Sequence, residues 1–396
     1  MAEKQRFETK LIHLGYQSKD YQDSLTPPIF QTSTFTFSNA EQGERRFAGE
    51  ESGYIYSRLG NPTVTLLEER IAALEEGEAG LAFGSGMAAV SSVLLSLTKS
   101  GSHILCSKGV YGCTFGFLKI LKEKFGVNHT FTDLASEDEI RQAIKPETSC
   151  IYIETPINPT MQLVDLSLVS SIAKERNIPV VVDNTFSSPY LQKPLALGCD
   201  FVIHSATKYI GGHGDVIAGV LVGKRDEINK IKMTTLKDFG GVISPFDAWL
   251  LLRGLKTLHI RMDRHCENTE RVAEMLKKHD MVERIFYPGD PDHPQYGLMK
   301  KQMKRGGGVL SFNIKGSKEE ARSFLNGLSF IKLAVSLGDA ETLIQHPATM
   351  THAAVDEASR LKMGITDQMI RLSCGLESWE DICEDLQSAF KKMKKG

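Results

Sequence analysis

The chain has 396 residues, of which 41% are hydrophobic and 24% charged, the balance of an ordinary water-soluble globular protein. The net charge is −2, so nothing in the bulk charge predicts nucleic acid or an anionic membrane as a partner. The 7 cysteines include no C-x-x-C pair, and the longest apolar run, Met87 to Leu97, is too short to span a bilayer. With the polar N-terminus, these features predict a cytoplasmic protein that has reduced thiols and no disulfide framework, structural zinc or signal peptide.

Residues 1–60 are predicted to form an irregular arm, because Thr26-Pro27-Pro28 breaks the backbone and no long period follows it. An arm of this size has little core of its own, so we expect it to pack on another subunit. It ends in a turn-rich segment that contains Tyr56 and Arg58. The guanidinium fork of Arg58 fits the geometry of a phosphate, although a surface turn with a salt-bridged arginine is the alternative.

Residues 61–255 alternate between short apolar segments and amphipathic ones. This pattern predicts an α/β domain built on a mostly parallel sheet with helices on both faces. The predicted strands are 80–83, 103–106, 129–132, 150–153, 179–183, 201–204 and 218–222. The predicted helices are 87–97, 115–125, 138–145 and 166–176. Ser136 and Glu139 form a capping-box pattern before the third helix. In such a sheet, ligands bind beyond the carboxyl ends of the strands.

In residues 256–396 the regular alternation of short strands and helices stops, which predicts a second and smaller α+β domain. A long helical pattern covers 258–278 and leads into shorter elements. The predicted strands are 282–287, 309–314, 331–335 and 370–373. Ser317, with Glu320 three residues later, predicts a capped helix between them.

The chemistry is predicted at the ends of two consecutive strands. Lys208 follows one strand and is flanked by Ser205 and Thr207, so it could hold an aldehyde cofactor as a Schiff base while the hydroxyls bind its phosphate. A solvated loop lysine is the alternative. Asp183 ends the preceding strand, and a carboxylate beside a pyridine nitrogen would keep the ring protonated and a better electron sink. Because both strands end at one edge, Lys208 and Asp183 can reach one ring.

A third signal is the segment Gly84-Ser-Gly86-Met87, which follows a predicted strand and opens a predicted helix. The free backbone N–H groups and the positive end of the helix dipole would favour a phosphate there. A simple turn is the alternative. The segment is not the G-x-G-x-x-G fingerprint of dinucleotide-binding folds.

Six segments together resemble one enzyme family. They are Gly84-Ser-Gly-Met87, Tyr111-Gly112, Glu154-Thr-Pro-Ile-Asn158-Pro159, Val182-Asp-Asn-Thr185, Ser205-Ala-Thr-Lys-Tyr209 and Arg371-Leu-Ser-Cys-Gly-Leu-Glu377. In this order, over nearly the whole chain, they are similar to the Cys/Met-metabolism family of pyridoxal phosphate enzymes. The resemblance implies the fold of type I pyridoxal-phosphate-dependent transferases, which is aspartate-aminotransferase-like, and pyridoxal 5'-phosphate as the cofactor.

The resemblance also implies a role for each matched residue. Lys208 holds the cofactor and shuttles protons, Asp183 pairs with its ring nitrogen, and Tyr111 stacks on the ring and acts as an acid or base. The phosphate ligands would be Gly86, Met87, Ser205 and Thr207, with Tyr56 and Arg58 from the neighbouring subunit. Asn158 would lie beside the phenolic oxygen, and Arg371 and Ser336 would bind the carboxylate of an amino-acid substrate. The resemblance implies a homotetramer built from two catalytic dimers.

Val335 points to a particular member of the family. Cystathionine enzymes of the family usually carry a glutamate directly before the Ser-Leu-Gly run, and here that position is Val335. An apolar side chain suits a thiomethyl group and leaves a distal ammonium unpaired. Cys113 and Lys237 are also similar to their counterparts in methionine γ-lyases, where they would contact the substrate. A small buried thiol is the alternative for Cys113. As a catalytic residue, we interpret it as a polarisable neighbour that tunes Tyr111, and not as a nucleophile.

The expected reaction is therefore the α,γ-elimination of L-methionine, and also of L-homocysteine. Its products would be methanethiol or hydrogen sulfide, 2-oxobutanoate and ammonia. The alternatives are a cystathionine γ-lyase, a cystathionine γ-synthase or an O-acetylhomoserine sulfhydrylase of the same family. No metal is expected, because no third ligand is spaced to join His346 and His352.

Overall fold

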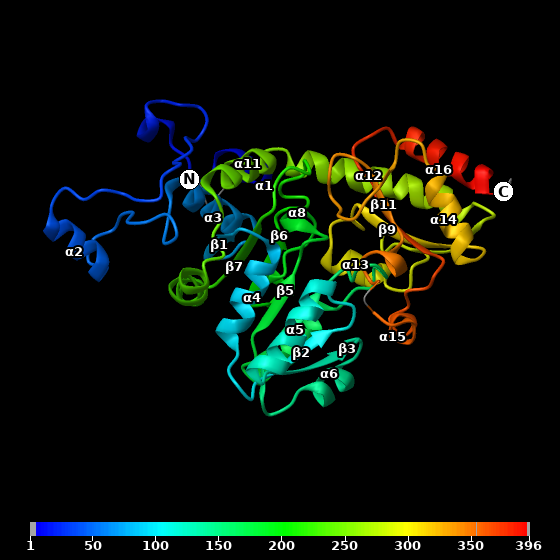
Figure 1. Cartoon of the computed structure of the whole chain (residues 1–396), viewed down its shortest axis with the longest axis horizontal. Helices are drawn as coiled ribbons and strands as arrows, with labels where there is room; N and C mark the ends of the chain where they lie inside the picture. The colour runs from blue at the N-terminus through cyan, green and yellow to red at the C-terminus, as the bar shows by residue number, and fades with distance from the viewer. Residues whose placement is uncertain (1–4, 354, 394–396) are drawn as a thin grey trace.

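Two β-sheets organise the computed structural model, which describes residues 5–353 and 355–393 (Figure 1). The arm comes first and contains α1 (Phe7–His13), the 3-10 helix η2 (Ser18–Tyr21) and α2 (Ala40–Ala48), so the prediction of a wholly irregular arm is wrong. Helix α1 packs on the core of its own chain through the buried Leu11, whereas the arm was predicted to pack on another subunit. Figure 1 shows α2 at the far end of the arm, well away from both sheets. Part of the polar N-terminus, residues 1–4, lies outside the described residues. Within the described part, no helix is long and apolar enough to cross a membrane.

The larger sheet has the strand order β1-β7-β6-β5-β4-β2-β3. Its strands are β1 (Ala79–Phe83), β2 (His103–Ser107), β3 (Asn128–Thr132), β4 (Thr148–Glu154), β5 (Val180–Asp183), β6 (Phe201–Ser205) and β7 (Gly219–Gly223). All neighbours are parallel except at β7, which runs antiparallel to both β1 and β6. The prediction of a mostly parallel sheet is therefore confirmed, and every predicted strand in this region is present.

Helices cover both faces of this sheet because successive strand residues point to opposite sides and both sides are apolar. On one face, α4 (Gly86–Leu97), α5 (Gly112–Phe125) and α9 (Arg225–Ile231) pack against Leu81, Ile203 and their neighbours. The helices on the other face are α3 (Pro62–Leu74), α6 (Glu137–Ala143), α7 (Leu166–Glu175), α11 (Pro245–Leu255) and the start of α12 (Leu258–Lys277). The predicted three-layer α/β arrangement is thus present.

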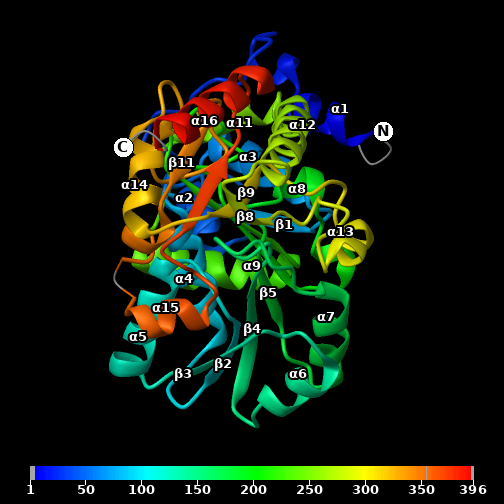
Figure 2. The ribbon, with the colours of Figure 1, turned by 90° about the vertical axis from the view of Figure 1, so that its right-hand side faces the viewer.

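The smaller sheet has the order β10-β11-β12-β9-β8. Its strands are β8 (Val282–Phe286), β9 (Val309–Ile314), β10 (Lys332–Leu333), β11 (Leu343–Gln345) and β12 (Met369–Ser373). The far end of α12 packs against it with α14 (Lys318–Asn326) and α16 (Trp379–Met393), as Figures 1 and 2 show. The predicted second sheet is confirmed. The predicted strand 331–335 is shorter than expected, and β11 was not predicted.

Short elements join these layers. They are α8 (Ser188–Leu191), η3 (Leu195–Leu197), the π-helical turn η4 (Lys232–Leu236), α10 (Lys237–Phe239), α13 (Tyr296–Gln302), η5 (Pro347–Thr349) and α15 (Glu357–Lys362). The capping box at Ser317 is confirmed in both halves. Ser136 caps α6, but the Glu139 carboxylate accepts from the N–H groups of Asp133 and Ala135, so the reciprocal half of that predicted box is wrong. The predicted domain boundaries at 60/61 and 255/256 stay a prediction.

Candidate active site

A cavity of about 330 Å³ lies where the carboxyl ends of β4, β5 and β6 face the loop 335–337 and β12. This is the edge of the sheet at which ligands were expected. The predicted site residues that line it are Gly86, Met87, Tyr111, Asn158, Asp183, Ser205, Thr207, Lys208, Val335, Ser336 and Arg371. The chain therefore brings most of the predicted site together, from segments that lie far apart in the sequence.

Lys208 lies in the turn after β6 and points into this cavity. Its Nζ donates to Ser336 Oγ at 2.8 Å. Burial lowers the pKa of Lys208, and the nearby positive charge of Arg371 lowers it further. A lowered pKa makes more of the neutral amine available, and the neutral form is the one that attacks an aldehyde. Lys208 thus has the environment of a nucleophilic lysine.

Asp183 ends β5, and its carboxylate is held by hydrogen bonds. Thr185 donates to Asp183 Oδ1 from its N–H at 3.1 Å and from its hydroxyl at 2.5 Å, and Tyr152 OH lies 3.4 Å from Oδ2. Burial raises the pKa of Asp183, whereas these donors lower it. The Thr185 hydroxyl also accepts from the backbone N–H of Ser205 at 2.8 Å. One hydroxyl therefore connects the ends of β5 and β6.

The phosphate cradle predicted at Gly86 is built by α4 and β6. Ser85 caps α4 by accepting from the Ala88 N–H. A Cβ on Gly86 would lie 2.9 Å from Ser205 Cβ and 3.1 Å from Ser205 Cα, so only glycine allows this close approach. The Thr207 hydroxyl is fixed by donating to Ala218 O at 3.2 Å and accepting from its N–H at 3.0 Å. The N-terminus of α4 and the hydroxyls of Ser205 and Thr207 thus line one part of the cavity wall, as a phosphate site requires.

Arg371 lies on β12 with only 3% of its surface exposed. Its Nη1 donates to Asn158 Oδ1 at 2.8 Å and its Nη2 to the Ser336 carbonyl at 2.6 Å. With its amide oxygen turned toward the guanidinium, Gln345 accepts at 3.0 Å. Burial lowers the pKa of Arg371 to about 10, so it is still a cation at neutral pH. Within the described chain, no carboxylate lies at ion-pair distance from it.

Tyr111 directly precedes α5, lines the cavity and is half-exposed. A hydrogen bond to Cys113 and burial raise the pKa of the Tyr111 phenol to about 12, so the phenol holds its proton at neutral pH. Its backbone N–H donates to Glu154 Oε2 at 2.7 Å. The Tyr111 phenol is placed to give a proton to a group inside the cavity.

Four predicted site residues do not line the cavity of this chain. Cys113 is exposed and reaches the site only through Tyr111. Arg58 Nη1 donates to the carbonyl of Lys237 at 2.5 Å, and the Arg58 guanidinium lies 5.7 Å from the centre of the Tyr56 ring. Tyr56, Arg58 and Lys237 thus form a group of their own between the arm and α10.

The residues of the site that were not predicted include Glu154, Thr185 and Gln345. Glu154 and Thr185 line the cavity, and Gln345 contacts Arg371 from β11. Glu154 ends a buried strand in a carboxylate, as Asp183 does, so the signal used for Asp183 could have found it. Gln345 carries no such signal, because its strand is only three residues long.

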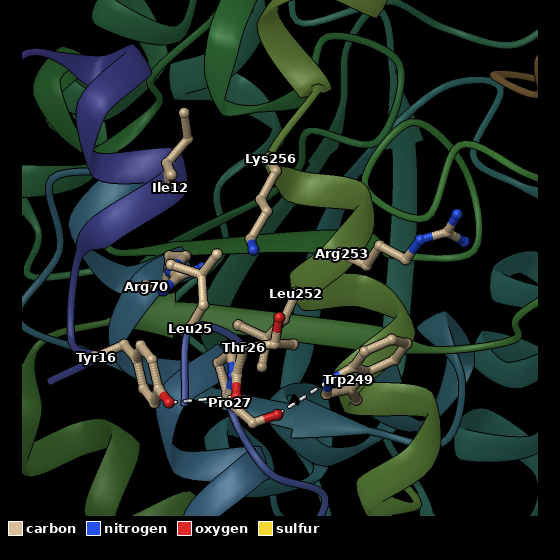
Figure 3. A pocket seen from close by; sticks show the side chains of 10 residues that line it. All are labelled: Ile12, Tyr16, Leu25, Thr26, Pro27, Arg70, Trp249, Leu252, Arg253 and Lys256. Carbon is tan, nitrogen blue, oxygen red and sulfur yellow. Dashed lines mark hydrogen bonds between the residues drawn. The ribbon is translucent and has the colours of Figure 1, made fainter. Parts of the chain in front are cut away.

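A second cavity, of about 250 Å³, lies between the arm and α11 (Figure 3). It is lined by Ile12, Tyr16, Leu25, Thr26, Pro27, Arg70, Trp249, Leu252, Arg253 and Lys256. Figure 3 shows Tyr16 and Trp249 on opposite sides, each with a hydrogen bond to the chain near Pro27. Its described lining contains no carboxylate, thiol or histidine. In the described residues, no three metal-ligating side chains gather at any site.

The first cavity fits one kind of cofactor. An amine with a lowered pKa, a strand-end carboxylate and a helix N-terminus with two hydroxyls match the aldehyde, the ring nitrogen and the phosphate of pyridoxal 5'-phosphate. With a mostly parallel sheet covered on both faces, this donor set defines a pyridoxal-phosphate-dependent enzyme of fold type I.

Comparison with known proteins gives the family. The Cys/Met metabolism PLP-dependent enzyme family matches residues 8–391, and the chain belongs to this family. It is 51% identical over 387 residues to L-methionine γ-lyase of Fusobacterium nucleatum, covering 97% of this chain and 98% of that protein. It is 50% identical to L-methionine γ-lyase of Treponema denticola, with 99% and 98% covered. The crystal structure of cystathionine γ-lyase from Lactobacillus plantarum complexed with L-serine superposes with a TM-score of 0.92 at 39% identity, covering 98% of this chain and 100% of that one.

Proposed function

We propose that this chain is a pyridoxal-phosphate-dependent carbon–sulfur lyase that carries out the α,γ-elimination of L-methionine, and also of L-homocysteine. The observation that carries this proposal is the presence, in one cavity, of Lys208, a buried Arg371 whose hydrogen-bond partners are neutral, and the apolar Val335. The relatives named L-methionine γ-lyase, at 50–51% identity over nearly the full length, support the same reaction.

The residues of the cavity divide the work. Bound pyridoxal phosphate supplies an electron sink that stabilises negative charge on the substrate carbons. Arg371 would orient the substrate carboxylate. Lys208 would hold the cofactor, and its free amine would take the α-proton. Tyr111, whose phenol is protonated at neutral pH, gives its proton to the departing sulfur. With one water consumed, L-methionine yields methanethiol, 2-oxobutanoate and ammonia.

The direct test is the product. The purified protein with pyridoxal phosphate is given L-methionine alone, and methanethiol and 2-oxobutanoate are measured together. Equal amounts of the two support the lyase. The alternatives are a cystathionine γ-lyase, a cystathionine γ-synthase and an O-acetylhomoserine sulfhydrylase. If no methanethiol forms and an activated homoserine is instead converted to a thioether with cysteine, or to a thiol with sulfide, one of the two transferases is correct.

Replacing Val335 with glutamate should shift the substrate preference toward cystathionine. Val335 lines the cavity and is 55% exposed in this chain, so a carboxylate there has room and water. It would attract the distal ammonium of cystathionine and lie against the apolar thiomethyl group of methionine. We expect kcat/KM to fall about tenfold for methionine and to rise about tenfold for cystathionine.

Val335→Gln is the matched control, because it has the size of glutamate without the charge. It should lower the methionine rate without raising the cystathionine rate. If the glutamine variant gains cystathionine activity as the glutamate variant does, size and not charge sets the preference.

We also propose that Tyr56, Arg58 and Lys237 act in the cavity of a second copy of the chain, so that two copies form a catalytic dimer. Two of these dimers would then form a homotetramer. Supporting this, the three lie together outside the cavity of their own chain, and the arm that bears Tyr56 and Arg58 extends away from the body (Figure 1). We place the enzyme in the cytoplasm, where the free cysteines would stay reduced.

Mixing two inactive variants should restore activity if the arm serves its partner. In a hybrid dimer of Lys208→Ala and Arg58→Ala subunits, one of the two sites has an intact lysine and an intact arm. Unfolding and refolding an equal mixture should therefore recover about a quarter of the wild-type activity, since about half of random dimers are hybrids. If Arg58 acts within its own chain, the mixture stays as inactive as the two variants alone.

A further inference from the structure

Glu154 is a buried acid of the cavity to which the reaction above gives no role. It ends β4, is only 3% exposed, and lies beside Asp183 in the strand register. One carboxylate oxygen accepts from the Tyr111 N–H at 2.7 Å, and the backbone N–H of Asn158 also donates to this carboxylate. Glu154 therefore holds two residues that form the walls of the site.

The two neighbouring acids differ in how well their negative charge is supported. Asp183 receives hydrogen bonds from two groups of Thr185, one of them a hydroxyl at 2.5 Å, and from Tyr152 OH. Burial raises the pKa of Glu154 well above its usual range, and the adjacent Asp183 raises it further. When two carboxyl groups share a buried place, one of them keeps a proton. Glu154 accepts from two backbone N–H groups, whereas Asp183 accepts from three donors, one of them a hydroxyl at 2.5 Å, so the proton is better placed on Glu154.

The proton on Glu154 affects the charge environment of Arg371. Its acceptors are Asn158 Oδ1, the Ser336 carbonyl and the Gln345 amide, all of them neutral. Asn158 stands between the two groups, since its side chain accepts from Arg371 while its N–H donates to Glu154. An ionised Glu154, although beyond ion-pair distance, would attract Arg371 electrostatically inside the protein. It would then compete with any carboxylate that arrives from solution.

We propose that Glu154 is a positioning residue that stays protonated while Arg371 is free, so that the site's own acid does not compete with the substrate carboxylate. This inference rests on the proposed function, because it takes Arg371 as the carboxylate site. The charged or titratable groups that face Glu154 or share its cavity are Asp183 on β5, Arg371 on β12, Tyr111 on α5, Tyr152 on β4 and Lys208 after β6.

The test uses the full-length protein without cofactor and butanoate as a simple monocarboxylate. Near neutral pH, Glu154→Gln should bind butanoate within about twofold of the wild type, because glutamine resembles a neutral acid. The infrared spectrum of the wild type should show the C=O band of a protonated carboxyl group that is absent from Glu154→Gln. When alkaline pH removes this band, the wild-type affinity for butanoate should fall about tenfold relative to that of the variant.

Two results would overturn the proposal. One is the absence of the protonated band near neutral pH. The other is butanoate binding by Glu154→Gln that is tenfold tighter or weaker than that of the wild type. Glu68→Gln is the matched control, because Glu68 is also buried, with its pKa raised to about 7, but lies outside the cavity. It should leave butanoate binding and the Glu154 band unchanged.

Two further experiments distinguish a failure of this proposal from misfolding of the variant and from a failure of the proposed function. If Glu154→Gln does not fold, isotope labelling of the glutamate carboxyls in the wild type and in Glu68→Gln identifies the band instead. Arg371→Met should abolish butanoate binding. If it binds butanoate as the wild type does, Arg371 is not the carboxylate site and the proposed function fails at that point, whatever the infrared band shows about Glu154.

Discussion

Lys208→Ala is expected to lower the rate of methanethiol release by about 10⁴-fold or more. Among the described residues, Lys208 is the one lysine that lines the cavity, so no other side chain there can hold an aldehyde as an imine. Its loss removes both the attachment of the cofactor and the base that takes the α-proton. The measurement is turnover with L-methionine, together with protein mass after borohydride reduction in the presence of pyridoxal phosphate.

The mass measurement separates this result from misfolding. The wild type should gain the mass of one reduced cofactor per chain on a peptide that contains residue 208, and Lys208→Ala should gain none there. Lys224→Ala is the control, because Lys224 is an exposed residue outside the cavity. It should behave as the wild type in both assays. A labelled and active Lys208→Ala enzyme would contradict the assignment of the nucleophile.

Asp183→Asn is expected to lower kcat/KM for L-methionine about a hundredfold and to weaken cofactor binding as well. The asparagine keeps the shape of the side chain but loses the charge that would pair with a protonated ring nitrogen. The cofactor then becomes a poorer electron sink, so proton removal slows. The measurements are steady-state turnover and the dissociation constant of pyridoxal phosphate from the apoprotein.

Thr185→Val gives a graded comparison, because it removes one donor to Asp183 and leaves the carboxylate in place. Its loss should be about tenfold, the size of one hydrogen bond to a charged group. Asp133→Asn changes an exposed carboxylate that pairs with Lys108 and should have no effect. Equal losses in Thr185→Val and Asp183→Asn would mean that geometry, and not charge, is what Asp183 provides.

Much of the α/β core could be predicted because its strands are short apolar runs that end in distinctive residues. The strand ends at Asp183 and Lys208 were predicted this way, and the chain places both in one cavity. Helices α3 and α11 were not predicted, because α3 is buried on nearly every side and shows no amphipathic period. Strand β11 has only three residues, too few for any period to appear.

The parts of the site that escaped prediction depend on contacts between distant segments. Gln345 contacts Arg371 because the two residues are opposite each other in the pairing of β11 with β12. The local sequence does not predict that pairing. The backbone bond from Tyr111 to Glu154 likewise joins the start of α5 to the end of β4. A family resemblance assigns roles to single residues, whereas contacts between distant segments become visible only in the folded structure.

The Thr185 hydroxyl sets a fixed spacing in this active site. It donates to the acid at the end of β5 and accepts from the backbone at the end of β6, so the two anchor points cannot drift apart independently. The distance between these two binding groups is therefore fixed, and it selects ligands of matching length. A cofactor analogue with a longer linker between its ring and its phosphate could reach Asp183 or the phosphate site at Ser205, but not both at once. We therefore expect the site to exclude it, although each half of the analogue fits by itself.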